Sequence, residues 1–119
     1  MKKTKMLKKN YEFKNVLSKG KYYSGKCIEA FVKKTDNKNI ENNFLGIAIG
    51  VKIAKATKRN FLKRLIRENY KNYENQIEIG YSIVFLWKKK VDLKEATFEN
   101  IEKDMEKIFD KAGILKEIE

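Results

Sequence analysis

One apolar segment, YSIVFLW at residues 81–87, constrains the fold of this chain more than any other. Its apolar residues follow one another without the alternation of a half-exposed strand, so it predicts a strand that is buried on both faces. Two further strands are predicted at 27–33 and 44–51, where the side chains alternate between two faces. The sequence therefore predicts a sheet whose inner strand is covered on both sides.

Helical patterns precede, separate and follow these strands. They span residues 10–19, 55–73 and 92–113. The length of 119 residues fits one domain, which begins with a basic, flexible segment over about residues 1–8. The order of one helix, two or three strands, a helix, a strand and a helix predicts an α+β fold. We expect a two-layer α-β sandwich with helices mainly on one side of the sheet.

Charge narrows the choice of partner. Lys and Arg total 28 against 16 Asp and Glu, which gives a formal net charge of +12. Such a balance attracts polyanions, with nucleic acid as the first candidate and an anionic membrane surface as the second. No apolar run approaches the roughly 18 residues that span a bilayer, and the basic start lacks the apolar region of a secretory signal. A cytoplasmic location is therefore expected.

The chain lacks the residues of common protein catalysts and metal sites. It has no histidine, and its one cysteine, Cys27, excludes an internal disulfide and a structural zinc site. Its carboxylates are scattered, and Asp104, Glu106 and Asp110 of the last predicted helix look like solvated positions. The sequence predicts no catalytic side chain and no metal ligand.

The helix at 55–73 concentrates the positive charge. Phe61, Leu62 and Leu65 are predicted on one apolar side, and Glu68 is the only acid of the segment. The cationic side of this helix could be exposed only to solvent, could lie on a membrane surface, or could bind phosphates. We favour the last, because solvated faces usually mix charges of both signs. The opposite side has a four-residue ladder of cations: Arg59, Lys63, Arg67 and Lys71.

A second candidate surface lies on the face of the sheet that the core does not use. Phe31 is on that face of its strand, and Phe13 of the first helix could lie beside it. The neighbouring strand offers only small residues there: Gly46, Ala48 and Gly50. The aromatics could be a stacking floor for a base, with the small residues admitting a foreign backbone. They could instead pack the helix against the sheet, and the pattern alone favours that packing role.

The segment GIAIGVKIAKATKRNFLKRLIRENY resembles the signature of the bacterial ribonuclease P protein subunit. The family pattern is Lys-Ala-hydrophobic-x-Arg-Asn-Arg-x-Lys-Arg-x-x-Arg-Glu, and this chain departs from it at Phe61, where the family has its second Arg. Leu17 stands where an aromatic is frequent, and Ala48 and Gly50 stand where the family favours Ser. The segments LKKNYEFKNVLSKGKYYSGK and GYSIVFLWKK are also similar to the family, so the resemblance covers about residues 6–113.

The resemblance implies a fold like the second domain of ribosomal protein S5, with the order αβββαβα and a left-handed βαβ crossover. It implies a protein, monomeric when alone and not membrane-bound, that assists ribonuclease P RNA. The RNA, with magnesium that it mainly binds itself, would remove the 5′ leader from precursor tRNA. The rival hypotheses are a generic RNA-binding or ribosome-associated module, a protein nuclease that acts alone, and a membrane-surface binder.

The resemblance also assigns residues to two surfaces. The basic helix and its start would contact the catalytic RNA through Lys52, Lys55, Arg59, Asn60, Lys63, Arg64, Arg67 and Lys71. A cleft for the leader would be lined by Phe13, Leu17, Phe31, Ala48 and Gly50. No catalytic residue is assigned to the protein.

Overall fold

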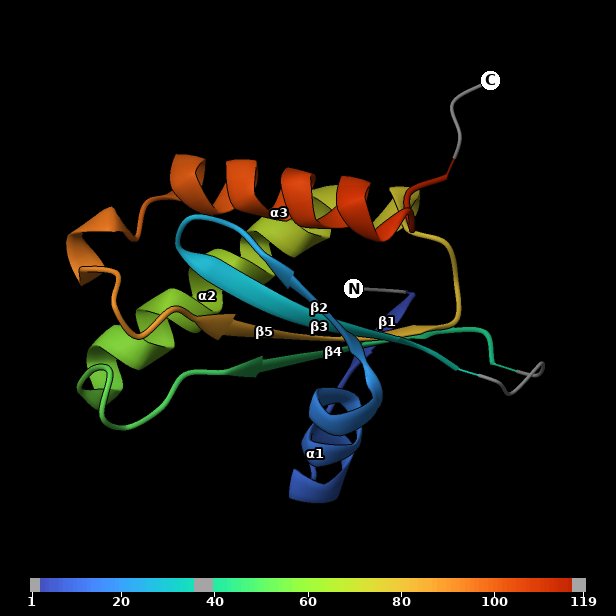
Figure 1. Cartoon of the computed structure of the whole chain (residues 1–119), viewed down its shortest axis with the longest axis horizontal. Helices are drawn as coiled ribbons and strands as arrows, with labels where there is room; N and C mark the ends of the chain where they lie inside the picture. The colour runs from blue at the N-terminus through green and yellow to red at the C-terminus, as the bar shows by residue number, and fades with distance from the viewer. Residues whose placement is uncertain (1–2, 36–39, 117–119) are drawn as a thin grey trace.

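A computed structural model describes residues 3–35 and 40–116 as one mixed sheet with three helices packed against it (Figure 1). The strands have the spatial order β1-β4-β5-β3-β2. β5 is central, parallel to β4 and antiparallel to β3, which explains its continuous apolar run. The strands are β1 Thr4–Met6, β2 Lys21–Ser24, β3 Ile28–Lys34, β4 Asn43–Ala48 and β5 Tyr81–Trp87.

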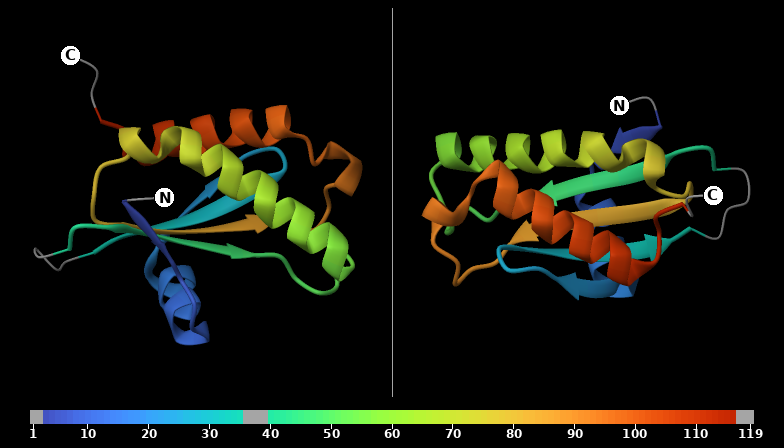
Figure 2. Two further views of the ribbon diagram at one scale, coloured as in Figure 1. Left: turned by 180° about the vertical axis from the view of Figure 1, so that it is seen from behind. Right: turned by 90° about the horizontal axis from the view of Figure 1, so that it is seen from above.

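Two helices cover one face of the sheet and the third covers part of the other. α2 and α3 lie side by side on one face, and α1 packs against the opposite face (Figures 1 and 2). The helices are α1 Asn10–Lys19, α2 Ala56–Tyr73 and α3 Phe98–Ala112, with short 3-10 turns at Glu74–Gln76 and Leu93–Glu95. The prediction of helices mainly on one side is confirmed, but α1 adds a partial third layer.

The connection from β4 through α2 to β5 is left-handed, as the resemblance implied. β4 and β5 are adjacent and parallel, so α2 is a crossover helix. In the view from above (Figure 2, right), both arrows point left, the helices lie in front of the sheet, and β5 lies below β4. Turned so that the arrows point upwards, β5 is to the left of β4, whereas nearly all such crossovers place the second strand to the right.

Apart from shifts of one residue in β3 and α2, three features differ from those predicted. Residues 4–6, expected in a flexible N-terminus, form β1 and pair in parallel with β4. This strand is too short to leave a periodic pattern in the sequence. β4 ends at Ala48, so Gly50 belongs to the connection that follows it. α3 begins only at Phe98, because the Thr97 hydroxyl accepts a hydrogen bond from the backbone N–H of Asn100 and caps the helix there.

The acid Asp104 was predicted to be solvated, and this is wrong. Its side chain is buried, and one carboxylate oxygen accepts hydrogen bonds from the backbone N–H groups of Cys27 at 2.7 Å and Ile28 at 3.0 Å. The other oxygen accepts from the N–H of Lys26 at 2.9 Å. The carboxylate thereby holds the turn between β2 and β3 against α3, and it satisfies backbone donors that the turn leaves unpaired.

Replacing Asp104 by Ala is expected to lower the free energy of unfolding by about 3 kcal/mol or more, since three backbone donors lose a charged acceptor. Urea denaturation measures this loss. Asp110→Ala is the matched control: it removes an exposed acid from the same helix and should change stability by roughly 0.5 kcal/mol or less. Equal effects of the two variants would contradict the anchoring role of Asp104.

The strand β1 is fixed to α2 by a buried polar pair. The hydroxyls of Thr4 and Tyr70 are 2.8 Å apart, and both side chains are buried. Burial raises the pKa of Tyr70 from 10.0 to about 12, because the phenolate would be poorly solvated there. The folded state therefore keeps this proton at pH values where the unfolded chain has lost it.

This difference predicts a loss of stability at alkaline pH. The contribution is complete below about pH 10 and is lost as the pH rises towards about 12, on the order of 2–3 kcal/mol in all. Denaturant unfolding across this range should show a steeper decline for the wild type than for Tyr70→Phe, which has no proton to lose. Parallel declines would show that other groups cause the alkaline unfolding.

Candidate nucleic-acid interface

The crossover helix α2 has a buried side and a cationic side. Its buried residues are Leu62, Ile66, Asn69 and Tyr70. Of the residues predicted to contact RNA, Lys52, Lys55, Asn60, Arg64 and Lys71 are exposed, and Arg59, Lys63 and Arg67 are half-buried. The structure therefore brings this whole predicted set to one helix and the connection before it.

Not every cation of the set is equally free. Arg59 Nη1 donates to the carbonyl oxygen of Ala54 at 2.7 Å, which ties the guanidinium to the β4–α2 connection. Lys71 Nζ lies 3.3 Å from Glu68 Oε1. Within residues 3–35 and 40–116, no ion pair involves Lys63, Arg64 or Arg67. The charge in the middle of α2 is therefore not compensated by a neighbouring acid among the described residues.

The beginning of α2 adds to this positive potential. Lys55 occupies the cap position without a side-chain hydrogen bond, and the first turn contains no acid. The first N–H groups of a helix carry a partial positive charge and attract anions. At this end of α2, the backbone and the lysines favour the same kind of ligand.

Phe61 was predicted on the apolar side of α2, and this is wrong. The side chain is 40% exposed, while the next residue, Leu62, is only 1% exposed. Phe61 lies about 100° around the helix from Leu62, at a margin that the sheet does not cover. It lines a shallow depression together with Thr57, Asn60, Arg64 and Arg67, which has a volume of about 390 Å³.

The open face of the sheet includes Phe31 and Gly46, as the alternation predicted. Tyr22 of β2, Phe31 of β3 and Val84 of β5 lie in one row across the strands, and Gly46 of β4 ends that row. α1 rests on this face through Phe13, Val16 and Leu17, which form a small apolar cluster with Leu7, Phe31, Phe44, Ala48, Val84 and Leu86. Four of the five predicted cleft residues therefore share one cluster.

The glycine of this row serves the helix rather than a ligand. A Cβ at position 46 would lie 2.6 Å from Cε1 of Phe13. Gly46 thus makes room for the Phe13 ring, and the expectation that a foreign backbone approaches there is wrong. Phe13 therefore packs α1 against the sheet, and its half-buried ring lies at the edge of the cluster.

Beside α1 the open face continues as a groove with a volume of about 630 Å³. Its floor is the next row of the sheet, where Glu29, Leu86 and Ala48 are cross-strand neighbours. The lining follows the chain from Ala48 through Gly50 to Ile53, along the connection into α2. The groove and the cationic start of α2 therefore share one segment. The remaining lining residues are Val51, Lys52, Trp87, Lys89, Val91 and Leu93.

Three residues of this surface were not predicted: Tyr22, Leu86 and Lys89. The Tyr22 hydroxyl donates to Glu29 Oε2 at 2.6 Å, and its ring centroid is 5.3 Å from that of Phe31. The hydrogen bond to Glu29 raises the pKa of Tyr22 above 10.0. The segment KYYS at 21–24 could have indicated a strand that contains Tyr22. Placing Tyr22 beside Phe31 also requires the register of β2 with β3, which the sequence alone does not give.

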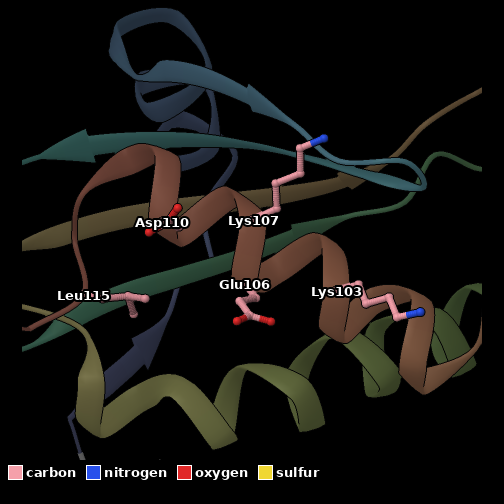
Figure 3. Close-up of a pocket in the computed structure, with 5 residues that line it drawn as sticks. All are labelled: Lys103, Glu106, Lys107, Asp110 and Leu115. Carbon is pink, nitrogen blue, oxygen red and sulfur yellow. The ribbon is translucent and has the colours of Figure 1, made fainter. Parts of the chain in front are cut away.

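A depression on α3 has a different character. It is lined by Lys103, Glu106, Lys107, Asp110 and Leu115 (Figure 3). The lining contains two cations and two anions, so its formal charges sum to zero. The depression offers a polyanion no net attraction, unlike the cationic side of α2.

Two further kinds of site bear on the function: a metal-ligand cluster and a membrane-spanning helix in the part of the chain that the structure describes. No group of three or more His, Cys, Asp or Glu residues there could hold a metal ion. No helix there is both long and apolar enough to cross a bilayer. What this surface offers is cations, aromatic rings and a groove.

Comparison with known proteins gives consistent matches over nearly the whole chain. A family model described as Ribonuclease P matches residues 1–113. The ribonuclease P protein component of Clostridioides difficile is 36% identical over 112 residues, covering 93% of this chain and 94% of that protein. The Clostridium novyi protein of the same name is 32% identical over 114 residues, covering 96% and 98%.

Solved structures agree with this match. The Staphylococcus aureus RNase P protein superposes with a TM-score of 0.77 at 27% identity, covering 93% of this chain and 97% of that one. The RNase P protein from Thermotoga maritima gives a TM-score of 0.73 at 26% identity, covering 97% and 98%.

Proposed function

Because this chain belongs to the ribonuclease P protein family, we propose that its two surfaces bind two different parts of the RNA. The chain is the protein subunit of ribonuclease P, the endoribonuclease of tRNA 5′ maturation, and works with ribonuclease P RNA. The cationic side of α2 binds this catalytic RNA, and the groove beside α1 binds the 5′ leader of precursor tRNA. The observation that carries the proposal is the segment from Ala48 to Ile53, which lines the groove and leads into α2.

The groove has the chemistry that a single strand of RNA requires. Phe31 does not line the groove but lies in the adjoining row of the sheet, where it packs against Tyr22 and presents an aromatic face on which an unpaired base can stack. Lys52 and Lys89 line the groove and supply charge for the phosphates. A sheet floor with small residues such as Ala48 leaves room for the ribose-phosphate backbone. Sequence-tolerant stacking of this kind suits a leader whose sequence varies among precursor tRNAs.

The protein contributes electrostatics and position, and the RNA contributes the reacting groups. Cations on α2 reduce the repulsion between two RNAs that must approach closely. Magnesium belongs to the RNA in this proposal, since the carboxylates of the described residues form no ligand cluster. The protein works in the cytoplasm and is monomeric in the absence of RNA.

The function is tested by mixing the protein with its organism's ribonuclease P RNA at low magnesium and measuring leader release from a precursor tRNA. Release should need both components. Cleavage by the protein alone, surviving nuclease treatment of the preparation, would mean a protein nuclease. RNA binding without stimulated cleavage would instead support a generic RNA-binding module.

Arg64→Ala is expected to weaken binding of ribonuclease P RNA, because Arg64 is exposed in the uncompensated middle of α2. The slope of log affinity against log salt should become shallower by about 0.7–0.9, as for one lost phosphate contact. Lys107→Ala removes an exposed cation from α3 and is the control with equal net charge. Equal losses would show that only net charge matters, and circular dichroism should show unchanged helix content for both variants.

Phe31→Ala is expected to weaken holoenzyme binding of precursor tRNA by roughly 5- to 100-fold, as for the loss of one stacked base. Binding of mature tRNA, which lacks the leader, should change little. Phe98→Ala removes a phenylalanine of α3 that is 38% exposed, more than the half-buried Phe31, and is the control for the loss of an aromatic ring elsewhere. A loss of affinity that is equal for precursor and mature tRNA would assign Phe31 to the packing of α1 alone.

A further inference from the structure

The ring of Phe61 is partly exposed and lies outside both apolar clusters that the described residues form. It is 40% exposed, and it is not among the buried residues of α2. Leaving a phenylalanine ring in water costs a substantial part of the roughly 1.5–3 kcal/mol that its burial would gain. A ligand that covers the ring would recover this free energy.

The surroundings of Phe61 restrict the chemistry of such a ligand. All residues that line its depression belong to α2, at spacings of three and four that place them on one side of the helix: Thr57, Asn60, Phe61, Arg64 and Arg67. No acid is among them. An apolar protein surface would have to desolvate two guanidinium groups, which is costly. A nucleobase with its phosphates offers a flat aromatic face for the ring and anionic oxygens for the arginines.

We infer that Phe61 is a stacking platform for one unpaired base of ribonuclease P RNA. The inference rests on the proposed function of α2 and adds a contact of a different kind to its phosphate contacts. Arg64 and Arg67 bind the phosphates on either side of the base, and their planar guanidiniums can also stack on it. Asn60 lies where its amide reaches a base edge or a 2′-hydroxyl. The chain thus uses an uncharged aromatic contact inside its cationic helix.

Substitutions at position 61 separate stacking from charge and from bulk. Phe61→Leu keeps an apolar side chain without an aromatic face and should weaken RNA binding by roughly 5- to 100-fold at an unchanged salt slope. Phe61→Trp keeps the face and should bind as tightly as the wild type. Phe61→Arg exchanges stacking for a phosphate contact and should steepen the salt slope by about 0.7–0.9. Thermal unfolding should change little in all three, since the ring lies outside both buried clusters of the described residues.

Phe61→Trp also gives a direct readout. The natural tryptophan, Trp87, is 1% exposed and is hydrogen-bonded to the Val91 carbonyl, so its fluorescence should respond little to RNA. The new indole should be quenched on addition of ribonuclease P RNA if a base stacks on it. A fluorescence titration of both proteins measures this difference.

The outcomes distinguish this inference from the proposed function. If Phe61→Leu binds ribonuclease P RNA as tightly as the wild type, or if the new tryptophan of Phe61→Trp is not quenched, the stacking platform is overturned. Either result leaves the proposed function of α2 intact. Loss of binding by the Leu variant with quenching in the Trp variant supports the platform. If Arg64→Ala also binds like the wild type, the cationic side of α2 is not the RNA contact and both ideas fail.

Discussion

The parallel pairing of β4 and β5 is the constraint on which the rest of the structure depends. Adjacent parallel strands require a crossover, and α2 supplies it while Leu62 and Ile66 are buried in the main core. Once that side is fixed to the sheet, the positions opposite it must face outwards. The cations of α2 are therefore presented by a helix whose orientation the core determines. A phosphate-binding surface of this kind is rigid before RNA arrives, which reduces the entropy lost on binding.

The second consequence concerns the other face of the sheet. β5 is buried on both sides, with Phe85 in the core under α2 and α3 and Val84 in the cluster under α1. α1 is too short to cover the whole face, and it rests where Gly46 admits the Phe13 ring. The row that contains Leu86 and Ala48 is left as a groove. The groove is thus the part of an apolar sheet face that a ten-residue helix does not reach.

Features with a local cause could be predicted from the sequence, and features with a distant partner could not. The apolar run at 81–87 predicted both ends of β5 correctly, because the signal for this strand is contained in the run itself. Asp104 was misplaced because its partners, the N–H groups near Cys27, are more than seventy positions away. β1 was missed for the same reason, since its pairing with β4 is non-local. The left-handed crossover came only from the resemblance, because spacing does not determine handedness.

Phe61 shows a further limit of prediction from the helical pattern, because a hydrophobic side chain at a helix margin can lie on either side of the covered surface. Hydrophobicity and the helical angle together placed it on one side with Leu62 and Leu65. Which side of the margin is covered depends on how the sheet lies under α2, and here it leaves Phe61 outside. Neighbouring cations in the ladder from Arg59 to Lys71 repel one another, so this side of α2 lowers the stability of the free protein. An exposed aromatic ring among those cations adds a second cost, and the proposed contacts with RNA would relieve both.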